Sequence, residues 1–234
     1  MYNILVCDDD RDIVSALEIY LTSEGYHTLT TYDGAQALKA VEENDIHLIL
    51  MDVMMPNLDG IRATAKLRER CNVPIILLTA KSEDADKVLG LNIGADDYVT
   101  KPFNPMEVMA RVKSQLRRYT TLGGRSMAGE EDTSLLRNGG IVFDDGAKAV
   151  TVDGESLNLT PLEFSILRLL LQHPGQVFST AQIYESVWND PAYGAENTVA
   201  VHIRHLREKI EIDPANPRYI KVVWGLGYKM EKAQ

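Results

Sequence analysis

The stretch ILVCDDDRDI, residues 4–13, places a short apolar run directly before three consecutive aspartates, Asp8, Asp9 and Asp10. The apolar run is typical of a buried β-strand, and the aspartates stand where that strand should end. Carboxylates so close together repel one another, and withdrawal from water is costly for a charge that has no partner. Another part of the fold must therefore stabilise this cluster.

The segment 1–118 alternates short apolar runs with amphipathic helical patterns. Strands are predicted at 3–7, 26–31, 46–51, 74–79 and 97–100, and helices near 11–23, 34–43, 59–70, 82–93 and 104–118. The third and fourth strands are apolar almost throughout, as strands buried on both faces must be. This alternation predicts an α/β domain with a doubly wound, five-stranded parallel sheet. In such a sheet, ligands bind at the carboxyl edge of the strands.

The pattern changes after residue 118. Residues 119–138 mix Gly, Ser, Thr and acidic residues without periodicity, which predicts a linker. In the segment 139–234, strand-and-turn patterns over 140–159 precede helical patterns near 161–173, 180–189 and 196–211, and a hairpin over 218–230 ends the series. Helices flanked by small sheets predict an α+β second domain.

Length and composition are consistent with two globular domains: the chain has 234 residues, of which 45% are hydrophobic and 25% charged. A formal charge of -10 argues against a protein that holds nucleic acid by bulk electrostatics, although local basic faces remain compatible with it. We expect an intracellular, cytoplasmic protein with no membrane partner, because the sequence shows no long apolar run and no leader-like N-terminus. The two cysteines, Cys7 and Cys71, are expected to be packing residues.

Polar residues stand at the ends of four predicted strands. The first strand supplies Asp8 and Asp9, the third Asp52, the fourth Thr79 and the fifth Lys101. If the aspartates converge at one edge, a hard divalent cation such as Mg²⁺ would relieve their repulsion. Asp52 could then act as the nucleophile of a phosphoryl transfer, with Lys101 and Thr79 binding the phosphoryl oxygens.

Two other interpretations of these acids remain open. Asp8 to Asp10 could form a solvated helix N-terminus, where acids suit the helix dipole, and a capping role is expected for Asp10 in any case. A Mg²⁺-dependent aspartyl-phosphate phosphatase would also use a strand-end aspartate. Such enzymes carry a second aspartate two positions later as general acid, where this chain has Met54.

The motifs ILVCDDD, LILMDVMMPNLDG, PIILLTA and GADDYVTKPF resemble the receiver domain of bacterial two-component response regulators. The resemblance implies a flavodoxin-like fold and phosphorylation of Asp52 by a partner sensor histidine kinase. It also implies that Asp9, Asp52 and the Met54 carbonyl hold Mg²⁺, with Asp8 acting mainly through water.

The same resemblance assigns further residues of the receiver domain. Thr79 and Tyr98 would be switch residues, and Lys101 would precede a cis peptide bond to Pro102. In the OmpR/PhoB subfamily, matching residues pair across a symmetric dimer that forms on phosphorylation. The implied pairs are Lys87 with Glu107, Asp97 with Arg111, and Asp96 with Arg118.

The segment 139–231 resembles the winged-helix DNA-binding domain of the same subfamily through LTPLEFSILRLLLQHPGQVFS, NTVAVHIRHLREKI and RYIKVVWGLGYKM. By that resemblance, 196–211 is the recognition helix and 218–230 the wing. One helical face, Val199, Ile203, Leu206 and Ile210, is expected to be core. The candidate DNA contacts are Asn197, Thr198, Val201, His202, Arg204, His205 and Arg207 on the helix, with Lys221, Trp224 and Tyr228 on the wing. Val201 is expected to be exposed and to pack on thymine methyl groups.

Two departures from the subfamily pattern bear on DNA binding. Trp224 and His205 stand where arginine is frequent, and Trp224 resembles the VanR-like branch. The segment 139–234 holds nine Lys and Arg against twelve Asp and Glu, a net charge of -3. Modest, salt-sensitive affinity for DNA is therefore expected of a monomer. Dimers on direct-repeat or paired promoter half-sites would compensate for it. The resemblance to this subfamily also implies RNA polymerase as a further partner. The alternative of a phosphorylation-independent winged-helix regulator stays open.

Overall fold

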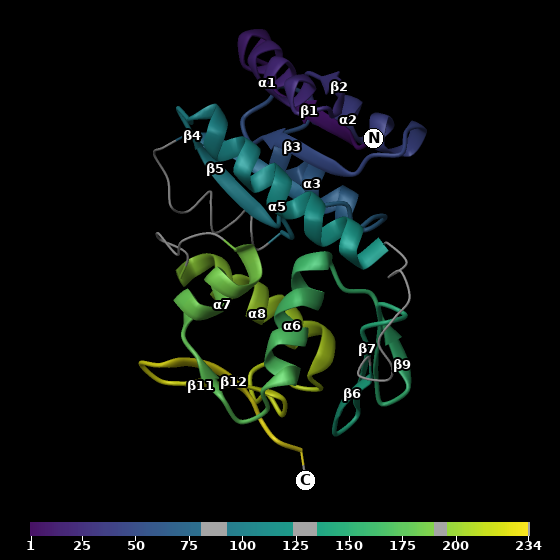
Figure 1. Cartoon of the computed structure of the whole chain (residues 1–234). Helices are drawn as coiled ribbons and strands as arrows, with labels where there is room; N and C mark the ends of the chain where they lie inside the picture. The colour runs from purple at the N-terminus through teal and green to yellow at the C-terminus, as the bar shows by residue number, and fades with distance from the viewer. Residues whose placement is uncertain (81–92, 124–134, 190–195, 234) are drawn as a thin grey trace. The chain divides into compact units, whose positions relative to one another are not determined.

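Five parallel strands form the sheet of the N-terminal part of the chain (Figure 1). They are β1 (Asn3–Cys7), β2 (His27–Thr31), β3 (Leu48–Asp52), β4 (Ile75–Ala80) and β5 (Asp97–Lys101), in the spatial order β2-β1-β3-β4-β5. The chain therefore winds outward in both directions from β1, and the predicted doubly wound, flavodoxin-like fold is confirmed. The connection that follows β1 lies on one face of the sheet, and the connection that follows β3 lies on the other. At such a position, ligands are expected to bind at the carboxyl ends of the two strands.

The computed structural model describes residues 1–80, 93–123, 135–189 and 196–233. It divides into two units, Met1–Tyr119 and Thr120–Gln234. The helix predicted near 82–93 falls almost entirely outside the described residues.

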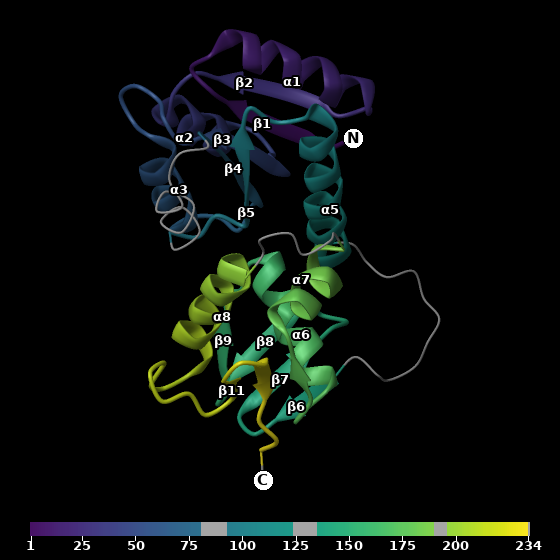
Figure 2. The same cartoon turned by 90° about the vertical axis from the view of Figure 1, so that its left-hand side faces the viewer.

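Helices cover both faces of the sheet (Figure 2). The helices α1 (Arg11–Ser23) and α5 (Pro105–Gly123) pack on one face, and α2 (Gly34–Glu43) and α3 (Gly60–Arg68) pack on the other. Strand β1 shows why: Ile4 and Val6 join the cluster under α1 and α5, whereas Leu5 and Cys7 join the cluster under α2 and α3. Four consecutive apolar residues therefore place side chains on both covered faces of the sheet.

In its described residues, the second unit combines two small antiparallel sheets with three helices. One sheet, in the order β6-β7-β8-β9, contains β6 (Leu135–Asn138), β7 (Ile141–Asp144), β8 (Ala149–Val152) and β9 (Glu155–Leu157). The helices are α6 (Pro161–Gln172), α7 (Thr180–Trp188) and α8 (Glu196–Ile210). The other sheet, in the order β10-β12-β11, contains β10 (Val177–Phe178), β11 (Ile220–Val223) and β12 (Gly227–Met230). This is the α+β, winged-helix architecture predicted.

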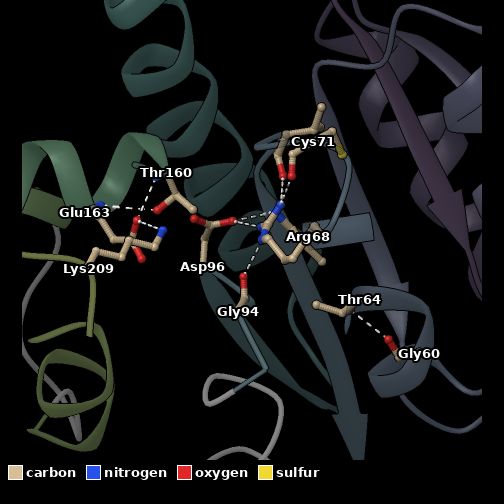
Figure 3. A network of polar contacts seen from close by, with 11 residues as sticks. Gly60, Thr64, Arg68, Cys71, Gly94, Asp96, Thr160, Glu163 and Lys209 are labelled. Atoms are coloured by element: carbon tan, nitrogen blue, oxygen red, sulfur yellow. Dashed lines mark hydrogen bonds and ion pairs between the residues drawn. The ribbon is translucent and has the colours of Figure 1, made fainter. Parts of the chain in front are cut away.

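Capping boxes fix the starts of α6 and α7. Thr160 caps α6 with Glu163 bonding back to it, and Ser179 caps α7 with Gln182 in the reciprocal role. Glu163 is buried and also accepts a hydrogen bond from Lys209 Nζ at 2.6 Å, so its charge is compensated by a residue of α8 (Figure 3). Helix α8 is thereby tied to the first turn of α6.

The expected linker 119–138 is shorter in the structure. Helix α5 continues to Gly123, and Leu135–Asn138 pair with Ile141–Asp144 as the first strand of the antiparallel sheet. The strand at the end of the segment was not predicted, because four residues are too few to show the alternation of a β-strand.

Candidate functional site

The carboxyl ends of β1, β3 and β5 bring two carboxylates and one ammonium group together. Asp8 directly follows β1 and is fully buried, and Asp52 ends β3 with 4% of its surface exposed. Lys101, the last residue of β5, places its Nζ 2.6 Å from Asp8 Oδ2 and 2.6 Å from Asp52 Oδ1. Lys101 thus offsets part of the repulsion among the aspartates.

The three predicted metal ligands lie close enough to share one ion. Oxygens of Asp8, Asp9 and Asp52 all lie within 4.8 Å of one another, and Asp9 is exposed while the other two are buried. Three carboxylates beside one lysine leave a net charge of about -2, and all donors are oxygens, which suits a small divalent cation. The donor set therefore fits Mg²⁺, with Asp9 on the solvent side.

Asp10 is separated from this cluster by its position. It caps α1, its Oδ1 accepting hydrogen bonds from the N–H groups of Asp12 at 2.9 Å and Ile13 at 3.4 Å. Its own N–H donates to Asp8 Oδ1 at 3.0 Å. The capping role expected for Asp10 is confirmed.

Both carboxylate oxygens of Asp52 have a partner. Oδ1 faces Lys101, and Oδ2 accepts a hydrogen bond from the Met54 N–H at 2.9 Å. The first residue of α3, Gly60, lies against the backbone of Asp52 so closely that a Cβ at position 60 would collide with the Asp52 carbonyl oxygen. The start of α3 therefore packs directly behind the acidic cluster.

Burial raises the pKa of Asp52 to about 6, and the charge of Asp8 acts in the same direction. Hydrogen bonding and charge from Lys101 lower this pKa but do not outweigh the burial. Burial alone would lower the pKa of Lys101, yet its hydrogen bonds to Asp52 and Asp8 raise the pKa above its ordinary value. Lys101 is therefore held in its cationic form beside a carboxylate that ionises only above mildly acidic pH.

The predicted switch residues lie on the two strands that follow β3 in the sheet. Thr79, on β4, is buried, and its hydroxyl donates to the Ala80 carbonyl at 3.4 Å. Tyr98, on β5, is half-buried and packs against the cluster under α2 and α3. The peptide bond between Lys101 and Pro102 is cis, as the resemblance implied.

The charged residues predicted on the β5 and α5 face interact within the chain. Arg111 Nη1 lies 2.9 Å from Asp97 Oδ2, and its Nη2 lies 3.1 Å from Glu107 Oε1. Arg118 is largely buried, and its Nη1 donates to Ser114 Oγ at 2.9 Å. Lys87 falls outside the described residues.

Asp96 has a partner within the chain that the sequence did not indicate. It is 1% exposed, and its Oδ2 lies 2.5 Å from Arg68 Nη2 of α3 and accepts the Ile75 N–H at 2.8 Å (Figure 3). Arg68 also donates to the carbonyls of Gly94 and Val73, both at 2.6 Å. Asp96 is therefore buried in a pair with Arg68 of the same chain, and its pairing with Arg118 across a dimer stays a prediction.

Helix α8 buries more of its circumference than the predicted stripe. The four predicted core residues are confirmed: Val199, Ile203, Leu206 and Ile210. Thr198 and His202, expected at the exposed margins, are each 2% exposed, because α8 packs against both α6 and α7 and the His202 ring lies 5.7 Å from the Trp188 ring.

Val201 also departs from its predicted position. It is 7% exposed although it lies outside the cluster that forms the core of its unit, so the expectation of an exposed valine is wrong. Covering an isolated apolar side chain is favourable in water. Among the helix candidates, Arg204 does face solvent, where it pairs with Glu208 at 2.8 Å, and His205 is half-buried. The side chain of Asn197 is not described.

Arg207 holds the wing. Its Nε and Nη2 donate to the Ile220 carbonyl at 3.1 and 2.8 Å, and its guanidinium lies 5.9 Å from the centre of the Tyr228 ring. Burial lowers the pKa of Arg207. These partners fix β11 against α8, and the contact of Arg207 with DNA stays a prediction.

Glu211 supports the same strand, a role that no sequence pattern indicated. It is 8% exposed and accepts hydrogen bonds from the N–H groups of Arg218, Tyr219 and Ile220 at 2.5 to 2.9 Å. Only the tertiary fold brings this carboxylate to the start of β11, so no sequence spacing signalled it.

The three wing candidates have different surroundings. Trp224 is 92% exposed, whereas Tyr228 is half-buried and packs on the core. Lys221 donates from its Nζ to the Pro217 carbonyl.

Among the described residues, no helix is long and apolar enough to cross a bilayer.

A flavodoxin-like unit with an acidic cluster at the carboxyl edge of its sheet, followed by a winged-helix unit, defines a DNA-binding response regulator. Family models agree with this class: a response regulator receiver domain matches residues 4–113, and a transcriptional regulatory protein, C terminal, matches residues 154–230.

Individual relatives match over nearly the whole chain. Regulatory protein VanR of Enterococcus faecium is 42% identical over 230 residues, covering 98% of both chains. DNA-binding response regulator MtrA of Mycolicibacterium smegmatis is 43% identical over 226 residues, covering 97% of this chain and 95% of its own. The crystal structure of DrrB, an OmpR/PhoB homologue of Thermotoga maritima, is 34% identical with a TM-score of 0.51 and 99% of each chain covered. The chain belongs to the OmpR/PhoB family of two-component response regulators and is similar to the VanR branch.

Proposed function

We propose that Asp52 accepts a phosphoryl group from a sensor histidine kinase and that this modification controls promoter binding by the second unit. The observation that carries the proposal is the convergence of Asp8, Asp9 and Asp52 with Lys101 at one edge of the parallel sheet. Such a cluster needs a cation and offers a nucleophilic carboxylate in the same place.

Each residue has a part in this transfer. A carboxylate oxygen of Asp52 attacks the phosphorus, and the bond between phosphorus and the donor's nitrogen breaks as the new P–O bond forms. Lys101 and Thr79 then have phosphoryl oxygens as new partners for their N–H and O–H groups. Asp8, Asp9, Asp52 and the Met54 carbonyl would hold Mg²⁺, which when bound supplies positive charge to the phosphoryl oxygens.

Repulsion within the acidic cluster is the reason that phosphorylation of this chain would require the metal. With Asp52 already modified, Asp8 and Asp9 would face a group of about -1.5 to -2 charges with only Lys101 to offset it. The cation holds these groups together, and its removal should therefore slow the modification and shorten its lifetime.

Dimerisation through the receiver is the proposed response. On α5, Arg111 pairs with the exposed Glu107, so this face carries charges of both signs, and the buried Asp97 of β5 holds Arg111 in place from below. A two-fold interface requires such self-complementarity. Tyr98 and Thr79, on β5 and β4, would transmit the modification to this face.

The dimer then binds direct-repeat or paired half-sites in promoters, with Arg204 the leading candidate on α8 for a contact to DNA. Arg204 is exposed and pairs with Glu208 on the same face, a partner that a phosphate or a guanine can replace. RNA polymerase is the expected further partner at the promoter, and the cytoplasm the expected compartment.

No observation favours an enzyme acting on aspartyl phosphates. Position 54, where such an enzyme would carry its general acid, holds a methionine whose side chain is exposed. A phosphorylation-independent regulator would not need Asp52, the carboxylates of Asp8 and Asp9, and Lys101 at one place in the sheet.

Sedimentation velocity with and without beryllofluoride and Mg²⁺ tests the proposal. We expect the natural chain to shift from monomer to dimer at tens of micromolar, Asp52→Asn to remain monomeric, and Arg111→Ala to dimerise more weakly. The exposed Arg62→Ala serves as the matched control. Equal sedimentation of the free and beryllofluoride-loaded natural chain would contradict dimerisation.

A further inference from the structure

The tip of the β11–β12 hairpin presents apolar side chains to solvent. Trp224 is 92% exposed, Leu226 62% and Val222 39%. The tip is a loop of three residues, closed by the Leu226 N–H donating to the Val223 carbonyl at 2.9 Å, with Gly225 at a φ of +73°. A cluster of large apolar side chains at such a projecting position marks a surface for interaction.

The hairpin is held rigidly against α8, as the contacts of Arg207 and Glu211 show. Strand β12 also pairs with β10, and a Cβ at Gly227 would collide with the Phe178 carbonyl. The wing tip therefore projects from the second unit in a fixed relation to α8 (Figure 1). A preorganised tip loses little conformational freedom on binding.

The hairpin and the residues that flank it are basic in an otherwise acidic unit. Residues 218–232 contain Arg218, Lys221, Lys229 and Lys232 against one acid, Glu231, a net charge of +3. Lys221 and Lys229 stand directly opposite one another across the two strands. Glu231 pairs with Lys229 at 3.0 Å, and the remaining positive charges of the segment favour a polyanionic partner.

We propose that Trp224 is an intercalating wedge that enters the minor groove of DNA bound by α8 and stacks on an unstacked base step. The inference rests on the proposed promoter binding and adds the chemistry of one contact. Large apolar side chains inserted between base pairs kink the duplex, and an indole ring offers a full aromatic face for stacking. Leu226, on the other side of Gly225, would fill the widened groove.

An intercalating Trp224 would give the chain a preference among DNA sequences, which electrostatic attraction to phosphates does not provide. Pyrimidine–purine steps unstack most easily, so a wedge favours sites that place such a step under the wing. The few basic residues of the unit would then be supplemented by stacking, which does not weaken with salt.

Tryptophan fluorescence tests the contact directly, because the two tryptophans differ in exposure. Trp188 is 2% exposed and serves as an internal reference. The probe is a duplex selected by the full chain from a random-sequence library. We expect this duplex to quench the Trp224 emission and to protect it from acrylamide. Trp224 that stays equally open to acrylamide in the complex would overturn the inference.

Selection from the same library tests specificity. The natural chain should enrich TA or CA steps at a fixed distance from the bases read by α8, and Trp224→Phe should retain this enrichment. Trp224→Arg should lose it, and Trp224→Ala should bind the selected duplex about ten-fold more weakly. Ile212→Ala is the matched control, since Ile212 is 93% exposed and lies outside the hairpin.

The two proposals fail differently. Absence of sequence-selective DNA binding by the natural chain would contradict the proposed function and the wedge together. Selective binding that responds to Arg204→Ala, combined with an unchanged selection for Trp224→Arg, would overturn the wedge alone.

Discussion

The Nζ of Lys101 lies 2.6 Å from Oδ1 of Asp52. The same ammonium group lies 2.6 Å from Asp8, so one lysine stabilises both buried carboxylates where a divalent cation would also bind. Lysine and cation therefore compete for the same oxygens, and the electrostatic balance between them governs the site.

Removal of the lysine charge should strengthen metal binding. We expect Lys101→Ala to bind Mg²⁺ at least about three-fold more tightly than the natural chain, because a nearby unit charge that repels the cation is lost. Isothermal titration calorimetry measures the affinity. Lys39→Ala is the control, since Lys39 is exposed and pairs with Glu43 on the surface of α2. Weaker Mg²⁺ binding by Lys101→Ala would show that Lys101 supports the metal site instead of competing with it.

The raised pKa of Asp52 predicts a pH-dependent effect on stability. The folded state holds the proton more tightly than the unfolded state, so ionisation of Asp52 costs stability as pH rises from about 4 through about 6. The cost at neutral pH is about 3 kcal/mol. Asp52→Asn, which cannot ionise, should therefore exceed the natural chain in unfolding free energy by up to that amount at pH 7.5, and by little at pH 4.

Urea unfolding without Mg²⁺ at the two pH values measures this difference. Asp45→Asn is the matched control, because the side chain of Asp45 is 87% exposed. If the advantage of Asp52→Asn were the same at both pH values, desolvation of Asp52 would not be its source.

The buried pair of Arg68 and Asp96 should contribute strongly to folding of the first unit. Arg68→Ala leaves the Asp96 carboxylate buried without the Arg68 charge, so we expect a loss of about 3–5 kcal/mol in unfolding free energy. Arg62→Ala, which removes an exposed ion pair with Asp59, should cost less than about 1 kcal/mol. Chemical denaturation of the two variants decides this, and equal losses would contradict the buried role of Arg68.

Arg204 and Arg207 should separate DNA contact from wing support. Arg204→Ala should weaken binding to a library-selected duplex by about 1–3 kcal/mol and leave thermal stability unchanged. Arg207→Ala should lower the melting temperature, because the Ile220 carbonyl loses the two guanidinium donors. Its salt dependence of DNA binding should match that of the natural chain, and a shallower salt dependence would instead assign Arg207 to a phosphate.

Strand ends were the most predictable part of the molecule. Alternation of strand and helix patterns predicted the strands, and the rule that parallel strands share a carboxyl edge was enough to bring Asp8, Asp52 and Lys101 together from the sequence alone. The pairing of Lys101 with both carboxylates was not foreseen, because a lysine side chain is long enough to reach several positions.

Contacts between elements distant in sequence were the least predictable part. Arg68 resembles an ordinary charge near the end of a helix, and only the packing of α3 beside β5 brings it to Asp96. Helical periodicity likewise identified one buried stripe on α8, but packing against two neighbouring helices also buried Thr198 and His202. A periodic pattern marks the centre of a buried face and leaves its width undetermined.

Phosphorylation of Asp52 is the central claim, and intact-protein mass measurement after incubation with acetyl phosphate and Mg²⁺ tests it most directly. We predict the gain of one phosphoryl group by the natural chain, none by Asp52→Asn, and none when a chelator removes Mg²⁺. A natural chain that gains no phosphoryl group, or an Asp52→Asn variant that gains one equally well, would contradict the claim.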